Sequence, residues 1–148
     1  MKLTQKQIDM IKKISELPRH LISNGFDEAL LLIRNEALAN NLDVKIHKYR
    51  TGYNCGTWIV PNKWELVRGY IKNLSGEIIL DSKIEPLAVH SYSLSISKRV
   101  SREELRQHLS YLEYAPEATP FIFKYYNRDW GFSCTKEFYR NLQDDEYD

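Results

Sequence analysis

Histidine and cysteine are the residue types in this 148-residue sequence that most readily support a metal site or a covalent catalyst. The four histidines are His20, His47, His90 and His108. No two of them are four residues apart, the spacing that places two metal ligands on one helix face. His47, His90 and Asp129 could still converge in the folded chain, yet no HExxH sequence, cysteine pair or carboxylate cluster favours a metal there. We therefore expect ordinary strand-surface histidines and no metal ligands.

The two cysteines, Cys55 and Cys134, lie far apart in the sequence and form no CxxC motif. Cys55, with His90 as its base, could act as a nucleophile only if the two side chains are within hydrogen-bond reach and the thiol pKa is lowered. Buried, reduced thiols are the more common state of such isolated cysteines. Gly52 and Gly56 fit neither phosphate-loop pattern, and tight turns explain both glycines. The sequence thus predicts no catalytic residue.

The densest chemical feature is aromatic and lies in residues 121–132, with the sequence FIFKYYNRDWGF. The alternation of side chains along a strand would place Phe121, Phe123 and Tyr125 on one face. One face of this strand must then belong to the core.

The end of this aromatic segment supplies four candidate binding residues: Tyr126, Arg128, Asp129 and Trp130. Aromatic and arginine side chains anchor many interfaces, so one hypothesis makes them a surface for a peptide, a sugar or a partner protein. In the alternative hypothesis, Trp130 plugs the end of a hairpin and Arg128 pairs with Asp129 at the turn. Asn and Asp beside a glycine are common turn residues, which favours the alternative.

Charge and hydropathy narrow the class of partner. The chain carries 21 Lys and Arg against 20 Asp and Glu, interspersed, so no net field attracts nucleic acid or an anionic membrane. The longest apolar run, residues 29–33, is much shorter than the ~20 residues that span a bilayer, and the N-terminus lacks the apolar part of a signal peptide. We expect a cytoplasmic protein that binds neither nucleic acid nor membranes.

Two amphipathic helices are predicted at the front of the chain. Thr4 and Gln7 form a capping box that starts the first helix, and Pro18 stops it. A second helix is expected at about residues 26–39. The first helix carries an apolar stripe, the candidate association surface: Ile8, Ile11 and Ile14. An apolar stripe left in water marks an interface, so this helix either docks on the rest of the chain or forms a homodimer.

Beyond the second helix, alternating apolar residues predict a strand-rich body. The expected strands lie at residues 43–47, 55–60, 66–72, 77–80, 89–96, 121–126 and 131–134. A third helix starts at a capping box of Ser101 and Glu104 and ends before Pro116, and a short helix follows at about residues 136–142. The expected fold is α+β: N-terminal helices followed by a mainly antiparallel, strand-rich body with one internal helix and a short C-terminal helix. The acidic residues 143–148 have few apolar side chains and should fray.

Four blocks of this sequence form a series: residues 17–30 (LPRHLISNGFDEAL), 56–64 (GTWIVPNKW), 89–93 (VHSYS) and 123–132 (FKYYNRDWGF). The series resembles bacterial zinc aminopeptidase-like proteins that carry a domain of unknown function inserted near the N-terminus. The resemblance implies that residues 1–49 are the helical start of an aminopeptidase-like domain, residues 50–142 the insert-like domain and residues 143–148 an acidic tail. In the parent fold the front helices would lie on a sheet whose other strands are absent here.

The resemblance also implies a function. In that architecture the metal-binding residues come after the insert, so zinc is expected only in a longer parent protein and no cofactor in this chain. The expected role is a non-catalytic segment of a zinc aminopeptidase-like protein, whose insert shapes substrate access or recognition. Its partner would be the missing catalytic portion. Two alternatives are a stand-alone protein-binding module built on the insert fold, and a self-contained hydrolase that uses Cys55 or a composite histidine site.

Overall fold

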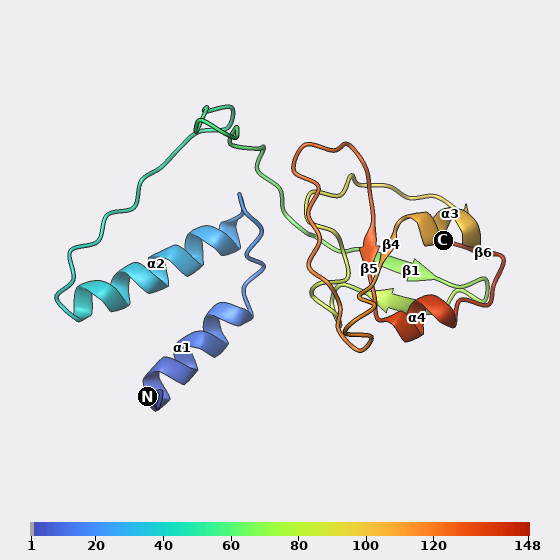
Figure 1. Cartoon of the computed structure of the whole chain (residues 1–148), viewed down its shortest axis with the longest axis horizontal. Coiled ribbons are helices and arrows are strands. Elements are labelled where there is room, and N and C mark those ends of the chain that lie inside the picture. Colours follow the sequence, from blue (N-terminus) through green and yellow to red (C-terminus); the bar gives the residue numbers. More distant parts are fainter. Residues whose placement is uncertain (1) are drawn as a thin grey trace. The chain divides into compact units, whose positions relative to one another are not determined.

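The structure, a computed structural model, describes residues 2–148, and its internal contacts divide the chain into two compact units (Figure 1). Unit 1 is Met1–Glu65 and unit 2 is Leu66–Asp148. Helices dominate unit 1, whereas unit 2 mixes short strands with short helices, which agrees with the α+β class expected from the sequence. From the sequence, we expect the insert-like domain of a longer protein to begin at residue 50. That boundary stays a prediction.

Helix α1 is the first element of unit 1 and spans Gln5–Ser15. The expected capping box forms: the amide of Gln7 donates to Oγ1 of Thr4 (3.3 Å), and the amide of Thr4 donates to Oε1 of Gln7 (2.8 Å). Each side chain thereby satisfies a backbone donor that has no acceptor within the helix. No residue of α1 is buried, so caps rather than a core account for its local stability.

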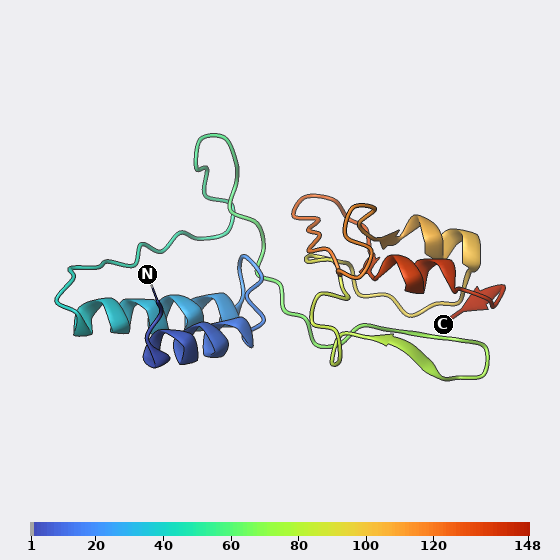
Figure 2. The ribbon, with the colours of Figure 1, turned by 60° about the horizontal axis from the view of Figure 1, so that its bottom comes forward.

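Helix α2 spans Asn24–Ala39 and lies beside α1 (Figure 2). Lys6 and Glu36 join the two helices through an ion pair of 2.9 Å. The helix starts slightly earlier than expected because the Ser23 hydroxyl accepts a hydrogen bond from the amide of Phe26 (3.1 Å) and caps its first turn. No helix in residues 2–148 has the length and apolar content needed to cross a membrane.

The rest of unit 1 contains none of the expected strands. Within residues 2–65, no backbone segment pairs with residues 43–47, although this stretch alternates apolar and polar side chains. A strand needs a partner to satisfy its N–H and C=O groups, and unit 1 offers none. Instead of the strand expected at residues 55–60, the chain makes a turn with a single bridge between Asn54 and Ile59.

Unit 1 buries few apolar side chains. In the described part of unit 1, the buried apolar residues are Ala29, Val60 and Pro61, and the ring of His20 is also buried. Leu31, Ile33 and Leu42 on and after α2 are each about half exposed. Each of these side chains is available to a second surface.

Unit 2 is built from short strands and two short helices. In chain order they are β1 (Tyr70–Lys72), β2 (Ile78–Asp81), β3 (Val100–Ser101), α3 (Arg102–Gln107), β4 (Leu109–Ser110), β5 (Phe132–Ser133), α4 (Lys136–Arg140) and β6 (Glu146–Tyr147). The pairs β1–β2 and β3–β6 are antiparallel, as the sequence predicts for most strands, whereas β4–β5 is parallel. Each sheet has only two strands, so side-chain packing rather than a continuous ladder must hold the unit together.

Several expected elements of unit 2 are shorter than the sequence suggests or do not form. Strand β1 begins at Tyr70 and not at residue 66, and residues 121–126 contribute only an isolated bridge at Phe123. Residues 89–96 form no strand and contribute only isolated bridges at Val89 and Ser91. Helix α3 ends at Gln107 rather than just before Pro116, because the following residues leave the helix and pair as β4 with β5. Pairing with a distant segment therefore overrides the local helical signal.

The acidic C-terminus packs on unit 2, contrary to the expected fraying of residues 143–148. Strand β6 pairs with β3, and Tyr147 is only 2% exposed. The amide of Lys72 donates to the carbonyl oxygen of Asp148 (2.7 Å), and the amide of Asp148 donates in return (3.1 Å). Arg99 also donates to both carboxylate oxygens of Asp148, at 2.7 and 2.9 Å. One buried tyrosine and one bidentate ion pair thus anchor a segment whose composition predicts disorder.

The core of unit 2 draws side chains from nearly every element. Its buried members are Ile71, Val100, Leu105, Leu109, Trp130, Cys134, Leu142 and Tyr147. Burial of apolar surface stabilises a fold by roughly 25 cal/mol per Å², so this contiguous cluster supplies the stability that the short sheets cannot. It also fixes the position of the aromatic segment at residues 121–132, because Trp130 belongs to the cluster.

Candidate functional site

The candidate binding residues of unit 2 lie on an irregular segment that leads into β5, and backbone hydrogen bonds fix this segment at both ends. At its start, the amide of Ser91 donates to the carbonyl oxygen of Ile122 (2.8 Å), and the amide of Lys124 donates to the carbonyl oxygen of Ser91 (2.9 Å). At its end, the amide of His90 donates to the carbonyl oxygen of Gly131 (3.0 Å). Residues 90–91, which precede α3 in the chain, therefore hold the aromatic segment at residues 121–132 in place.

Trp130 lies in the core of unit 2, with 9% of its surface exposed. Its ring stacks on the imidazole of His108, with ring centres 3.8 Å apart and planes inclined by 16°. It meets Phe132 edge to face at 6.3 Å, and Nζ of Lys98 lies 5.4 Å from its ring centre. This is the position of a packing residue that closes the end of the segment, and not that of an exposed anchor.

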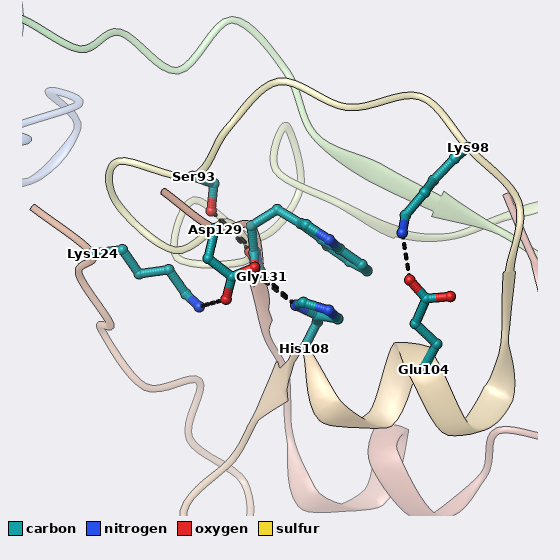
Figure 3. Close-up of polar contacts among 8 residues, drawn as sticks. Ser93, Lys98, Glu104, His108, Lys124, Asp129 and Gly131 are labelled. Atoms are coloured by element: carbon teal, nitrogen blue, oxygen red, sulfur yellow. Dashed lines mark hydrogen bonds and ion pairs between the residues drawn. The ribbon is translucent and has the colours of Figure 1, made fainter. Parts of the chain in front are cut away.

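Asp129 links Lys124 and His108 (Figure 3). Nζ of Lys124 donates to Oδ2 of Asp129 (2.5 Å), and Nδ1 of His108 lies 3.5 Å from Oδ1 of Asp129 and 2.9 Å from the carbonyl oxygen of Trp130. The hydrogen bond from Lys124 lowers the pKa of Asp129 below its usual range. The ion pair expected between Arg128 and Asp129 is absent within residues 2–148, because Lys124 takes that carboxylate instead.

The remaining candidates, Tyr126 and Arg128, are exposed on the turn that follows. Beside them stand three aromatic rings from alternate positions. The ring centres of Phe121 and Phe123 are 6.2 Å apart, and those of Phe123 and Tyr125 are 4.5 Å apart with planes inclined by only 18°. Phe121 and Phe123 are 51% and 54% exposed. The exposed aromatic surface is therefore centred on these two phenylalanines, and not on Trp130.

His90 is a core residue, although the sequence suggests a strand-surface position. It is 3% exposed and lies against Gly131, where an added Cβ would come within 2.3 Å of Nδ1 of His90. Neither ring nitrogen makes a well-formed hydrogen bond within residues 2–148. Burial, and after it the charge of Lys124, lower the pKa of His90 to about 4, and the nearby backbone of Phe132 offsets only part of this effect. The imidazole is accordingly neutral at pH 7.

The composite metal site suggested by the sequence is divided between the units. His47 belongs to unit 1, whereas His90 and Asp129 belong to unit 2. Nowhere in the described chain, residues 2–148, do three His, Cys, Asp or Glu side chains cluster as ligands. His20 is buried and meets Trp64 edge to face, with ring centres 4.6 Å apart. A catalytic zinc ion takes three protein ligands.

The two cysteines occupy different environments. Cys134 is 1% exposed in the core of unit 2, and burial raises the pKa of its thiol to about 12. A thiol in that state is a poor nucleophile because the reactive species is the thiolate. Cys55 is half-buried in unit 1, while its suggested base His90 belongs to unit 2.

The candidate association surface on α1 is partly covered. Ile8 and Ile14 are half-buried, and Ile11 is 55% exposed. An apolar side chain exposed to this extent is available to a second surface. Association through this stripe stays a prediction.

Sequence reasoning did not single out Lys124 and His108, which organise the surroundings of Asp129 and Trp130. The alternation of aromatic residues did place Phe121 and Phe123 on one face. A possible signal for Lys124 was its position inside an otherwise aromatic run, where a buried ammonium requires an acidic partner. No comparable signal pointed to His108, since its contact with Trp130 depends on the pairing of β4 with β5.

Residues 63–148, which include all of unit 2, match the family described as "Domain of unknown function (DUF2172)". This match covers more than half of the chain, and the chain belongs to that family.

A similar protein and a similar solved structure, both from Clostridium acetobutylicum, match unit 1 as well as unit 2. One, a "Putative polysaccharide biosynthesis protein with aminopeptidase-like domain", is 29% identical over 140 residues, which are 95% of this chain and 31% of that protein. The other is a crystal structure of a "putative peptidase" that is 28% identical, with a TM-score of 0.81 over 96% of this chain and 32% of that chain. The chain thus spans about a third of the length of these relatives, whose names describe an aminopeptidase-like domain and a putative peptidase.

Proposed function

We propose that this chain is a non-catalytic segment of a longer zinc aminopeptidase-like protein, in which unit 2 shapes substrate access or recognition. The names of the similar protein and of the similar solved structure support a peptidase-like context, and each chain is about three times as long as the region matched here. The described residues offer no cluster of three ligands, so the remainder of such a protein would hold the zinc. Zinc bound there would activate a water molecule for hydrolysis.

The incomplete packing of unit 1 is the observation that carries this proposal. Residues 43–47 alternate like a strand but have no backbone partner in the described part of the chain, and the apolar residues Leu31 and Leu42 are half exposed. A sheet in the remainder of a longer protein would accept this strand and cover these side chains. Such an arrangement explains why the similarity to both relatives continues through unit 1.

Unit 2 would act as a rigid attachment and take no part in the chemistry. It has its own core, its cysteine is an inert thiol and its buried histidine is neutral. The exposed groups of its aromatic segment include aromatic rings and an arginine, which suit recognition of a substrate. We also place the protein in the cytoplasm, because reduced cysteines and a near-neutral net charge suit that compartment.

A chimera tests this function. In it, the present chain replaces the matching region of the C. acetobutylicum protein, and the unmodified protein is the control. We expect the chimera to retain zinc and to hydrolyse leucine p-nitroanilide in a chelator-sensitive way, whereas the 148-residue chain alone does neither. Replacing only unit 2 by a Gly/Ser linker should leave zinc bound and change the ratio of kcat/KM values for dipeptides and longer peptides. Absence of zinc from the parent protein, or stoichiometric zinc in the isolated chain, contradicts the proposal.

The exposed rings and the stripe on α1 also favour a second candidate function, a stand-alone protein-binding module. In that case the isolated chain would be stable, and its binding would not depend on any catalytic portion. Comparing the thermal stability of the isolated chain with that of the chimera separates the two functions: residues 1–65 should melt at a much lower temperature in the isolated chain if unit 1 is part of a larger domain.

A further inference from the structure

The aromatic segment of unit 2 has one β edge that is free. Ser91 pairs with one side of the segment through the parallel bridge to Phe123, using the carbonyl oxygen of Ile122 and the amide of Lys124. Backbone groups of successive residues in an extended segment point to opposite sides, so those of Phe121 and Phe123 face away from Ser91. Within residues 2–148, no hydrogen bond satisfies the amide or the carbonyl oxygen of either phenylalanine.

The rings on this segment suit an extended peptide better than a sugar. Sugar rings bind to the open faces of aromatic side chains, but Phe123 and Tyr125 cover one face of each other at 4.5 Å. The half-exposed rings of Phe121 and Phe123 instead form an apolar border along the free edge. A peptide strand offers the matching chemistry, since it carries alternating N–H and C=O groups together with side chains at the same spacing.

The charges near the edge indicate which end groups such a peptide would carry. Lys124 is neutralised by Asp129, whereas Arg128 is exposed on the turn and has no ion-pair partner in the described chain. The turn is closed by a hydrogen bond from the amide of Asn127 to the carbonyl oxygen of Lys124 (3.2 Å). An unpaired guanidinium here favours a ligand with a carboxylate.

We propose that the free edge at residues 121–123 binds an extended peptide by strand addition, with Phe121 and Phe123 against alternate side chains and Arg128 near a carboxylate. This inference rests on the proposed function, because it takes the substrate class of a peptidase-like protein as the ligand. It makes unit 2 a site that holds the peptide chain itself and that needs neither zinc nor the catalytic portion.

The test is a peptide titration of the ¹⁵N-labelled 148-residue chain, in which binding is monitored by NMR through the chemical shifts of the backbone amides. The probe is a hexapeptide that alternates valine and threonine and ends in glutamate. Two further versions carry N-methyl groups on one or the other alternate set of residues. Only one set of peptide amides faces the protein in strand addition, so one version should lose at least about tenfold in affinity while the other binds nearly as well as the parent peptide. The amides of Phe121 and Phe123 should shift most.

Matched variants locate the site. Phe123→Ala should weaken binding about tenfold, because it removes a contact that the peptide side chains make. Tyr114→Ala, which removes a ring that is 86% exposed elsewhere in unit 2, should leave binding unchanged. Arg128→Gln should weaken binding of the acidic peptide but not that of a version with neutral ends. The spectra of the free variants confirm that unit 2 stays folded.

Several results would overturn the inference. These are equal loss of binding by both methylated peptides, the same shifts with cellohexaose, and shifts at residues 121–123 that appear on concentrating the chain without peptide. The outcome is separable from that of the proposed function. If the isolated chain binds the peptide by strand addition but the chimera is inactive and free of zinc, the peptide site is supported and the proposed function is contradicted. If the chimera is active but the isolated chain binds no peptide, the proposed function is supported and the peptide site is contradicted.

Discussion

Helix α1 of unit 1 buries none of its residues, whereas the much shorter helix α3 of unit 2 buries Leu105 almost completely. Both helices start with a hydroxyl cap, from Thr4 and Ser101 respectively, so their local start signals are similar. What differs is the surface that each helix covers. A cap contributes about 1 kcal/mol, while a contiguous core contributes many times that amount, and only unit 2 has one within the described chain.

The strands repeat this contrast. Residues 43–47 have the better alternating pattern but remain unpaired within the described part of unit 1. Residues 143–148 have an unfavourable composition, yet β6 pairs with β3 because Tyr147 is buried and Asp148 meets Arg99. An available partner therefore decides strand formation here, and the local pattern does not.

The largest expected effect concerns the core of unit 2. Trp130→Ala should destabilise unit 2 by roughly 3–5 kcal/mol, because it removes a buried indole and its stacking on His108. Trp58→Ala in unit 1 is the control, since Trp58 is 40% exposed. Denaturant unfolding followed by circular dichroism measures both. Equal, small losses for the two variants would mean that Trp130 is not part of a stabilising core.

The contact between Gly131 and His90 also tests how tightly the interior of unit 2 is packed. Gly131→Ala places a Cβ 2.3 Å from Nδ1 of a buried ring, so it should cost about 1–3 kcal/mol by overpacking. His90→Ala makes room, so the double variant should recover part of the loss that the glycine substitution causes. A double-mutant cycle from urea unfolding reports this coupling, and additive effects would contradict the contact.

A pH dependence of unit 2 follows from His90. The pKa of His90 in the folded state, about 4, lies below the ordinary value of 6.5, because burial opposes the charge. The unfolded state therefore takes up the proton first, and stability falls as the pH drops from about 6.5 towards 4. The loss due to this group should reach about 2 kcal/mol at pH 5. His90→Leu should flatten the stability profile over this range, and an unchanged profile would show that His90 is accessible to solvent.

Much of the fold could be predicted wherever the signal is local. The caps at Thr4 and Ser101 and the starts of their helices were evident from hydroxyl and Glu or Gln side chains at fixed spacing. The end of α3 was not, because the pairing of β4 with β5 joins residues far apart in the sequence. The same limit applies to β6, whose partner strand lies before α3.

In the candidate site, too, the features with a local sequence signal could be predicted, and those that depend on the tertiary fold could not. Alternation correctly put Phe121 and Phe123 on one face, since strand geometry is local. Lys124, the partner of Asp129, is a local neighbour that a turn brings close, and it was missed although the two residues lie in one segment. His108, the partner of Trp130, was missed because it reaches the indole through the tertiary fold. The burial of His90 was equally hidden, as it depends on close contact with Gly131.

A substitution on α1 should have the smallest effect on the free energy of unfolding, because this helix buries none of its residues. We expect it to change the association of the chain instead. Ile11 is 55% exposed and lies between the half-buried Ile8 and Ile14, so a second copy of the chain could cover it. Ile11→Glu should convert a dimer to a monomer, because a charge in an apolar interface is costly, while unit 2 stays folded. Lys13→Glu on the same helix is the control and should leave the dimer intact. Size-exclusion chromatography with light scattering distinguishes these outcomes. A wild-type chain that is monomeric at high concentration rules out association through α1 and leaves docking, on the rest of the chain or on a longer protein, as the cover for this stripe.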